Sequence, residues 1–157
     1  MESRDFRNAL GQFATGVCVI TTQTPSHGAV GMTVNSFAAV SLDPALVLWS
    51  IQNNSECFSW FADAPSFGIN VLAHDQMALS NRYASKNNHT LLDSEYRIGR
   101  TGCPVLKGCL ASFECQMHEQ IDGGDHTILV GNVLAMEQSP ADKQPLLFFS
   151  GKYRELH

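Results

Sequence analysis

Basic residues are few in this 157-residue sequence, and those present are scattered along it. The chain carries 10 Lys and Arg against 15 Asp and Glu, which gives a formal net charge of −5. Nucleic acids and anionic membrane surfaces attract clustered positive charge, and the sequence has no such cluster. It therefore predicts no nucleic-acid partner and no membrane partner.

Long apolar runs are missing too. No run approaches the roughly 20 residues that a membrane-spanning helix needs. The opening "MESRDFRNALGQFATG" lacks the basic-then-apolar order of a signal peptide. The expected location is therefore the cytoplasm.

The cysteines form no CxxC pair, and their number is odd. A disulfide framework needs paired cysteines and a zinc site needs closely spaced ligands, so the sequence predicts neither. We expect small buried side chains that pack as hydrophobes. The five are Cys18, Cys57, Cys103, Cys109 and Cys115.

Strand-like segments dominate what is present. Length and an apolar content of 44% favour a single domain over residues 1–157. Hairpin-length turns join the strands, and three short helices are expected near the start, around 55–64 and around 75–84. This pattern predicts a mainly β fold, a closed or nearly closed antiparallel β-barrel with a few short helices. Strands are expected at 17–24, from 29 onward, and at 45–51, 66–72, 109–121, 126–138 and 145–151.

The first helix and the strand at 109–121 carry further predictions. Ser3 is the expected cap of the first helix. In "CLASFECQMHEQI" apolar and polar residues alternate, so Ser112 and Glu114 should face away from the core. The "DGGD" that follows is a strong hairpin signal.

Short polar residues end the strand in "GMTVNSFAAVSLDP". Thr33, Asn35 and Ser36 lie between apolar neighbours, and such a surface suits a flat heteroaromatic ring with a polar edge. The alternative is an ordinary strand that ends in a polar turn.

The step "SIQNNSE" leads from a strand into a helix. A helix N-terminus suits a phosphate, and Ser55, Asn53 and Asn54 would add donors, although Glu56 adds a negative charge. The alternative is ordinary capping by Ser55.

The stretch "GGDHTILVGNV" places Asp125 beside His126. Neighbours on a strand point to opposite faces, so Asp125 is not expected to orient the His126 ring. A nucleophilic triad is not predicted, because no GxSxG elbow is present. His118 could approach His126 across the hairpin, but two histidines alone make a weak site, so no metal is expected. The tail "GKYREL" could simply be a solvated terminus.

Taken together, several segments resemble the flavin reductase-like family, the short-chain reductases of two-component monooxygenases. In order and spacing they cover nearly the whole chain. The matching segments are "FRNALGQFATGVCVITT" at 6–22, "GMTVNSFAAVSLDPALVLWSI" at 31–51, "FGINVLAHDQMALSNRYA" at 67–84, "GGDHTILVGNV" at 123–133 and "LLFFSGKYREL" at 146–156.

The resemblance implies an FMN-binding split β-barrel that forms a homodimer, with flavin sites near the subunit interface. It implies oxidation of NADH or NADPH and reduction of FMN or FAD. Reduced flavin would then diffuse to a separate oxygenase. Hydride passes between the two nucleotides, so no protein nucleophile is needed.

The resemblance also implies site residues. His126 would touch the flavin or position the nicotinamide, and Ser55 would contact phosphate. The chain has Ser55-Glu56-Cys57 where the family often has Ser-x-Thr, and a thiol is a poor substitute for a phosphate-binding hydroxyl. The implied flavin contacts are Thr33, Val34, Asn35, Ser36 and Ala38 for the ring, Ser50, Gln52 and Asn53 for its edge and ribityl chain, Arg82 and Tyr83 near the tail, and Gly124, Tyr153 and Arg154 at the cleft.

Two other functions are compatible with a barrel of this kind. One is a protein that binds flavin or haem without using a nicotinamide nucleotide. The other is a pyridoxal-phosphate oxidase, which is disfavoured because the sequence lacks a cluster of basic phosphate ligands.

Overall fold

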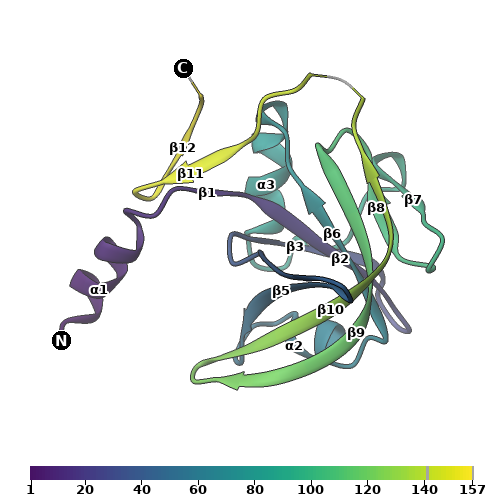
Figure 1. The fold of residues 1–157 in the computed structure, drawn as a ribbon, viewed down its shortest axis with the longest axis horizontal. Helices are drawn as coiled ribbons and strands as arrows, with labels where there is room; N and C mark the ends of the chain where they lie inside the picture. The colour runs from purple at the N-terminus through teal and green to yellow at the C-terminus, as the bar shows by residue number, and fades with distance from the viewer. Residues whose placement is uncertain (141, 157) are drawn as a thin grey trace.

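The computed structural model describes residues 1–140 and 142–156, and strands make up most of its regular structure (Figure 1). The helices are short: α1 (Ser3–Leu10), α2 (Phe58–Ala62), α3 (Met77–Tyr83) and the 3-10 turns η1 (His74–Gln76) and η2 (Asp93–Glu95). The strands are β1 (Thr15–Gly16), β2 (Cys18–Thr24), β3 (Gly28–Val34), β4 (Ala38–Leu42), β5 (Ala45–Gln52), β6 (Ser66–Val71), β7 (Tyr96–Ile98), β8 (Pro104–Leu106), β9 (Ala111–Gly123), β10 (His126–Gln138), β11 (Leu147–Phe149) and β12 (Lys152–Arg154). The predicted mainly β fold with few helices is confirmed.

The main sheet has seven strands in the order β3-β2-β6-β9-β10-β5-β4, and neighbouring strands are antiparallel. Smaller sheets join β1, β11 and β12, and β7 with β8. Among the strands described, β3 and β4 end the main sheet and do not pair with each other. Closure into a barrel therefore stays a prediction.

The longest strands, β9 and β10, form one hairpin within the main sheet, and β5 pairs with the half of β10 next to the turn (Figure 1). Its turn consists of Gly124 and Asp125, because β9 ends at Gly123 and β10 begins at His126. Gly124 has a φ of +77°, a conformation that glycine adopts without steric cost. The "DGGD" hairpin prediction is confirmed.

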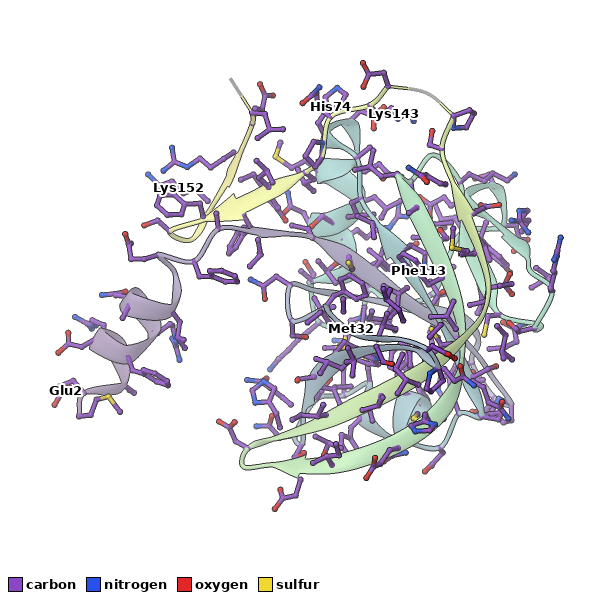
Figure 2. All side chains as sticks on the ribbon, in the orientation of Figure 1. Glu2, Met32, His74, Phe113, Lys143 and Lys152 are labelled. Carbon is purple, nitrogen blue, oxygen red and sulfur yellow. The ribbon has the colours of Figure 1, made fainter. Side chains whose placement is uncertain are left out.

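A buried cluster beneath β5 fixes that strand. Trp49 is fully buried, and its ring meets Phe61 of α2 edge-on at 5.2 Å and Phe67 of β6 at 5.9 Å. Met32 on β3 and Phe113 on β9 pack against the same cluster (Figure 2). Aromatic rings in such edge-on pairs contribute beyond their buried area. The cluster therefore holds the strand that ends at Gln52.

Helix α1 projects from the rest of the chain and buries none of its residues (Figure 1). Its N-cap is Glu2, which makes no side-chain capping bond, so the predicted cap at Ser3 is wrong. Phe6 and Leu10 remain half exposed or more, as does Phe13 just beyond the helix. In the described part of the chain, no helix is long and apolar enough to cross a bilayer.

The expected polar face of β9 is buried at its start. Ser112 donates to Asn70 Oδ1 at 2.9 Å, and Glu114 Oε1 accepts from the backbone and hydroxyl of Thr101 at 2.9 and 2.7 Å. Thr101 lies between β7 and β8, whose hairpin covers this face. The prediction that Ser112 and Glu114 face outward is wrong, because this covering hairpin comes from a segment read as loop.

The cysteines are free and buried, as predicted. Burial raises the pKa of the Cys18, Cys57 and Cys115 thiols to about 12 and that of Cys109 to about 11. The thiolate is the reactive form, so we expect no alkylation by iodoacetamide at pH 8 in the folded protein and full alkylation after unfolding in urea. Mass spectrometry reads the result, and labelling of the folded protein at any cysteine would contradict this assignment.

Candidate functional site

A cavity of about 200 Å³ lies where β3 ends, and it is referred to below as the Thr33 cavity. It brings the polar strand end together with Tyr153, which lies 120 residues further along the chain. Helix α3 and β11 complete its walls. The lining residues are Val17, Thr33, Val34, Asn35, Ser80, Ala84, Phe148 and Tyr153.

Hydrogen bonds hold Thr33 and Tyr153, which line two walls of the cavity, against α3. Thr33 Oγ1 donates to the Ser80 carbonyl at 2.7 Å. The Tyr153 hydroxyl donates to Asn81 Oδ1 at 3.0 Å and lies 2.7 Å from Ser80 Oγ, which then acts as the donor. The Tyr153 ring also meets Phe148 edge-on at 5.5 Å. Tyr153 therefore presents a fixed aromatic wall to the cavity.

Ser36 lies just beyond the cavity, after the end of β3. Its side chain bonds to the backbone of β5. Its hydroxyl donates to the Ser50 carbonyl at 3.1 Å and accepts from the Ser50 amide at 2.9 Å. The hydroxyl donors of Thr33 and Ser36 are thus used within the protein. The Asn35 side chain makes no hydrogen bond to any described residue and remains available to a ligand.

A larger groove of about 600 Å³ adjoins the Thr33 cavity and shares Asn35 and Phe148 with it. In its wall, Thr15 Oγ1 is buried without a hydrogen-bond partner among the residues described. A buried polar atom of this kind normally has a partner. The other lining residues are Arg7, Asn8, Leu10, Gly11, Gln12, Phe13, Ser150 and Gly151.

The end of β5 holds the tip of the β9–β10 hairpin. Gln52 lies opposite His126 in the sheet register. Next to it, the Asn53 backbone amide donates to the Asp125 carbonyl at 2.9 Å, and Asn53 Nδ2 donates to the Gly124 carbonyl at 3.1 Å. Thr127 Oγ1 donates to Asn53 Oδ1 at 2.7 Å. Asn53 therefore binds the hairpin turn from both sides.

Asp125 contacts the His126 ring, contrary to the sequence prediction. His126 Nδ1 donates to Asp125 Oδ1 at 2.6 Å, since a carboxylate can only accept. The side chains are 37% and 90% exposed. Asp125 belongs to the turn rather than the strand, so the alternation of strand side chains does not apply to it. The bond leaves His126 Nε2 free to face a ligand.

No metal site forms here. His118 lies in the bulge opposite Val130 and Gly131, four to five residues along β10 from His126. At about 3.3 Å per residue, the two histidines are too far apart to share an ion. Among the residues described, no group of three metal-ligating side chains occurs.

Tyr83 is fully buried, and its place near a flavin tail stays a prediction. Its hydroxyl donates to Glu95 at 2.7 Å, and Arg82 bonds both Glu95 and the Tyr83 hydroxyl. Burial raises the pKa of Tyr83 to about 12. Tyr83 and Arg82 therefore tie α3 to η2, and the next residue, Ala84, lines the Thr33 cavity instead.

The Glu95 cluster predicts a pH dependence. Burial alone would raise the pKa of the Glu95 carboxyl, but hydrogen bonds from Arg82 and Tyr83 outweigh it and hold that pKa below its ordinary value. A lowered folded pKa contributes stability above the ordinary carboxyl range, and that stability is lost as the pH falls. Glu95→Gln should cost about 1–2 kcal/mol at pH 7, and the difference from the parent protein should shrink towards pH 3.

Urea unfolding at several pH values measures this difference. Asp93→Asn is the matched control, because Asp93 is an exposed neighbour with no hydrogen bond to the described residues. A Glu95→Gln difference that stays constant with pH would contradict the charge assignment.

The residues expected at a phosphate have other partners. Helix α2 has only five residues and begins at Phe58, so it offers little helix dipole. Ser55 Oγ accepts from the Cys57 amide at 3.1 Å, and Cys57 is 1% exposed and belongs to the core. The Cys57 thiol therefore does not face the site. Glu56 accepts from the Asn87 amide and from His89, and it holds the segment around them in place.

Four residues of the Thr33 cavity were not predicted from the sequence, namely Val17, Ser80, Ala84 and Phe148. They lie just before β2, on α3, just after α3 and on β11, and no local pattern marks them. Arg154 lines neither the Thr33 cavity nor the groove, because it points to the other face of β12 from Tyr153 and lies over Phe149 at 5.9 Å.

Comparison with known proteins gives a consistent result. The family model described as "Flavin reductase like domain" matches residues 10–157. The chain is 49% identical over 151 residues to "FMN reductase (NADH) SmoA" of Agrobacterium fabrum strain C58, covering 96% of this chain and 84% of that protein. It is 38% identical over 154 residues to "Flavin-dependent monooxygenase, reductase subunit HsaB" of Mycobacterium tuberculosis, covering 98% and 82%. A solved structure of the Streptomyces globisporus NADH:FAD oxidoreductase SgcE6 with NAD and FAD fragments superposes with a TM-score of 0.91 at 32% identity, covering 99% and 93%.

Proposed function

The chain belongs to the flavin reductase-like family, and we propose that it reduces FMN or FAD with NADH or NADPH and supplies the reduced flavin to a separate oxygenase. The observation that carries this proposal is the Thr33 cavity, where Thr33, Asn35 and Tyr153 meet beside a groove. Its relatives, the FMN reductase (NADH) SmoA and the monooxygenase reductase subunit HsaB, support it by their names.

The residues present fit a flavin. The Thr33 cavity offers an aromatic wall from Tyr153 and Phe148, and free polar groups at Asn35. The adjoining groove gives the flavin more room. Thr15 Oγ1, which has no partner among the described residues, offers the flavin a hydrogen-bond partner there. We assign the ring to Thr33, Val34, Asn35 and the backbone of Ser36 to Ala38, and its edge and tail to Ser50, Gln52, Ser55, Arg82 and Gly124.

Hydride transfer itself is chemistry that the nicotinamide and flavin supply when both are bound. The protein holds them in contact and keeps water from the apolar wall. With Nδ1 donating to Asp125, Nε2 is the free nitrogen of the His126 ring, and in the tautomer that carries its proton on Nδ1 it is an acceptor. It therefore suits an N–H of the nicotinamide carboxamide, which assigns His126 to positioning rather than to acid–base work.

We also propose a single split-barrel domain over residues 1–157 that works as a homodimer. Exposed apolar residues support the dimer: Phe6 and Leu10 on α1, and Val40 and Leu42 on the edge strand β4. Exposed large apolar side chains can mark an interface between copies of a chain. The free cysteines support the cytoplasm, where thiols stay reduced.

A turnover assay tests the proposal. NADH or NADPH is mixed with FMN or FAD, and nicotinamide absorbance is followed with and without the protein. Oxidation well above the no-protein control is expected for at least one pair. The absence of oxidation with all four pairs would favour a protein that binds flavin or haem without nicotinamide turnover.

A further inference from the structure

We propose that Asn53 positions the nicotinamide nucleotide through His126 and is not a ligand of the flavin. This inference rests on the proposed function and assigns one residue a role on the opposite substrate from the one that the resemblance implies. It follows from where the polar atoms of Asn53 point.

Every polar group of the Asn53 side chain is used in the hairpin. Nδ2 donates to the Gly124 carbonyl at 3.1 Å, and Oδ1 accepts from Thr127 Oγ1 at 2.7 Å. The backbone amide adds a bond to the Asp125 carbonyl at 2.9 Å. Asp125 and Thr127 directly flank His126 and Gly124 lies one residue further away, so Asn53 bonds to residues on both sides of His126 in sequence.

Asn53 and Asp125 hold the histidine in complementary ways. Asp125 Oδ1 accepts from the ring at 2.6 Å and sets which nitrogen carries the proton. Asp125 is 90% exposed, so its position depends on the turn that carries it. Asn53 fixes that turn by binding the carbonyls of both turn residues. Without the Asn53 side chain, the Gly124 carbonyl and the Thr127 hydroxyl would bond to water, only the backbone amide of residue 53 would still hold the turn, and the ring would be held less firmly.

The neighbouring residue shows that this role is specific. Asn54 is exposed, and its side chain makes no hydrogen bond within the described parts of the chain. The Asn53 side chain therefore bonds to the hairpin, whereas that of the adjacent Asn54 does not. Asn54→Ala is the matched control for Asn53→Ala.

The test compares Asn53→Ala, Thr127→Val and Asn54→Ala in the full chain. One hydrogen bond is worth roughly a factor of 3–10 in an equilibrium constant, so Asn53→Ala should raise the KM for NADH about 5–10-fold and Thr127→Val about 2–3-fold. For both variants, kcat and the FMN dissociation constant, measured by fluorescence quenching, should stay within about twofold. Asn54→Ala should match the parent protein. A weaker FMN affinity in Asn53→Ala with an unchanged KM for NADH would overturn the proposal.

A double variant separates positioning from simple loss of structure. If Asn53 acts through His126, Asn53→Ala should add little to the KM of a His126→Ala protein. Independent, multiplying effects would overturn the inference.

The ring nitrogens of His126 give a readout that needs no turnover. In ¹⁵N NMR spectra of the ligand-free protein, Asn53→Ala should shift them, whereas Asn54→Ala should not. Failure of the parent protein to oxidise NADH with any flavin would refute the proposed function, while unchanged ring signals in Asn53→Ala would refute this inference alone.

Discussion

His126→Ala should raise the KM for NADH by about tenfold and leave kcat within about twofold. The ring is bonded to Asp125 through Nδ1, which leaves Nε2 without a partner among the described residues and, under the proposed function, free to bond the nicotinamide. A residue that contacts the nicotinamide equally before and during hydride transfer affects binding rather than turnover. Steady-state kinetics with a saturating flavin measure both constants.

His118→Ala is the matched control for this variant. His118 lies on the same hairpin and is exposed, and it makes no hydrogen bond to the residues described. Its loss should leave both constants unchanged. The positioning role is wrong if His126→Ala leaves the KM for NADH at the parent value, or if kcat falls a hundredfold at constant KM.

Trp49→Ala should lower the free energy of unfolding by about 3–5 kcal/mol. The ring is fully buried against Phe61 and Phe67, and its removal leaves a cavity beneath β5 that the surrounding strands cannot fill. Equilibrium unfolding in urea measures the change. A loss below about 1 kcal/mol would contradict the assignment of this cluster as the principal core.

Trp49→Phe serves as the control for that variant. It keeps an aromatic ring in place and removes Trp49 Nε1, which is buried without a hydrogen-bond partner in the described structure. The cost should therefore be only about 1–2 kcal/mol, since losing an unsatisfied donor offsets part of the lost packing. Ser50 and Gln52 follow Trp49 on the same strand. Because Trp49→Phe keeps that strand in place, this variant should keep the parent KM values.

Local signals predicted the strands well. The β-branched run before Thr24 became β2, the apolar run before Gln52 became β5, and "DGGD" became the turn between β9 and β10. Each depends on neighbours in sequence, which periodicity and turn chemistry record. Contacts between residues far apart in the sequence could not be predicted from these local signals. Glu114 looked like a solvent-facing residue because its partner, Thr101, comes from a segment with no strand signal.

The same division holds for the site. Thr33 and Asn35 stand out in the sequence as short polar residues at a strand end, but only the fold places Tyr153 beside them. The contact between Asp125 and His126 was missed because a strand rule was applied to a turn residue. The bonds of Asn53 join residues more than 70 positions apart, and no spacing rule reports such pairs.

The most direct test of the account is anaerobic mixing of the protein with FMN and NADH while the flavin absorbance is followed. The account predicts bleaching of the flavin that is faster than without protein and slower with NADH deuterated at C4, because the C4 hydride is the group transferred. Flavin absorbance that bleaches no faster with the protein than without it would contradict the assignment of this chain as a flavin reductase.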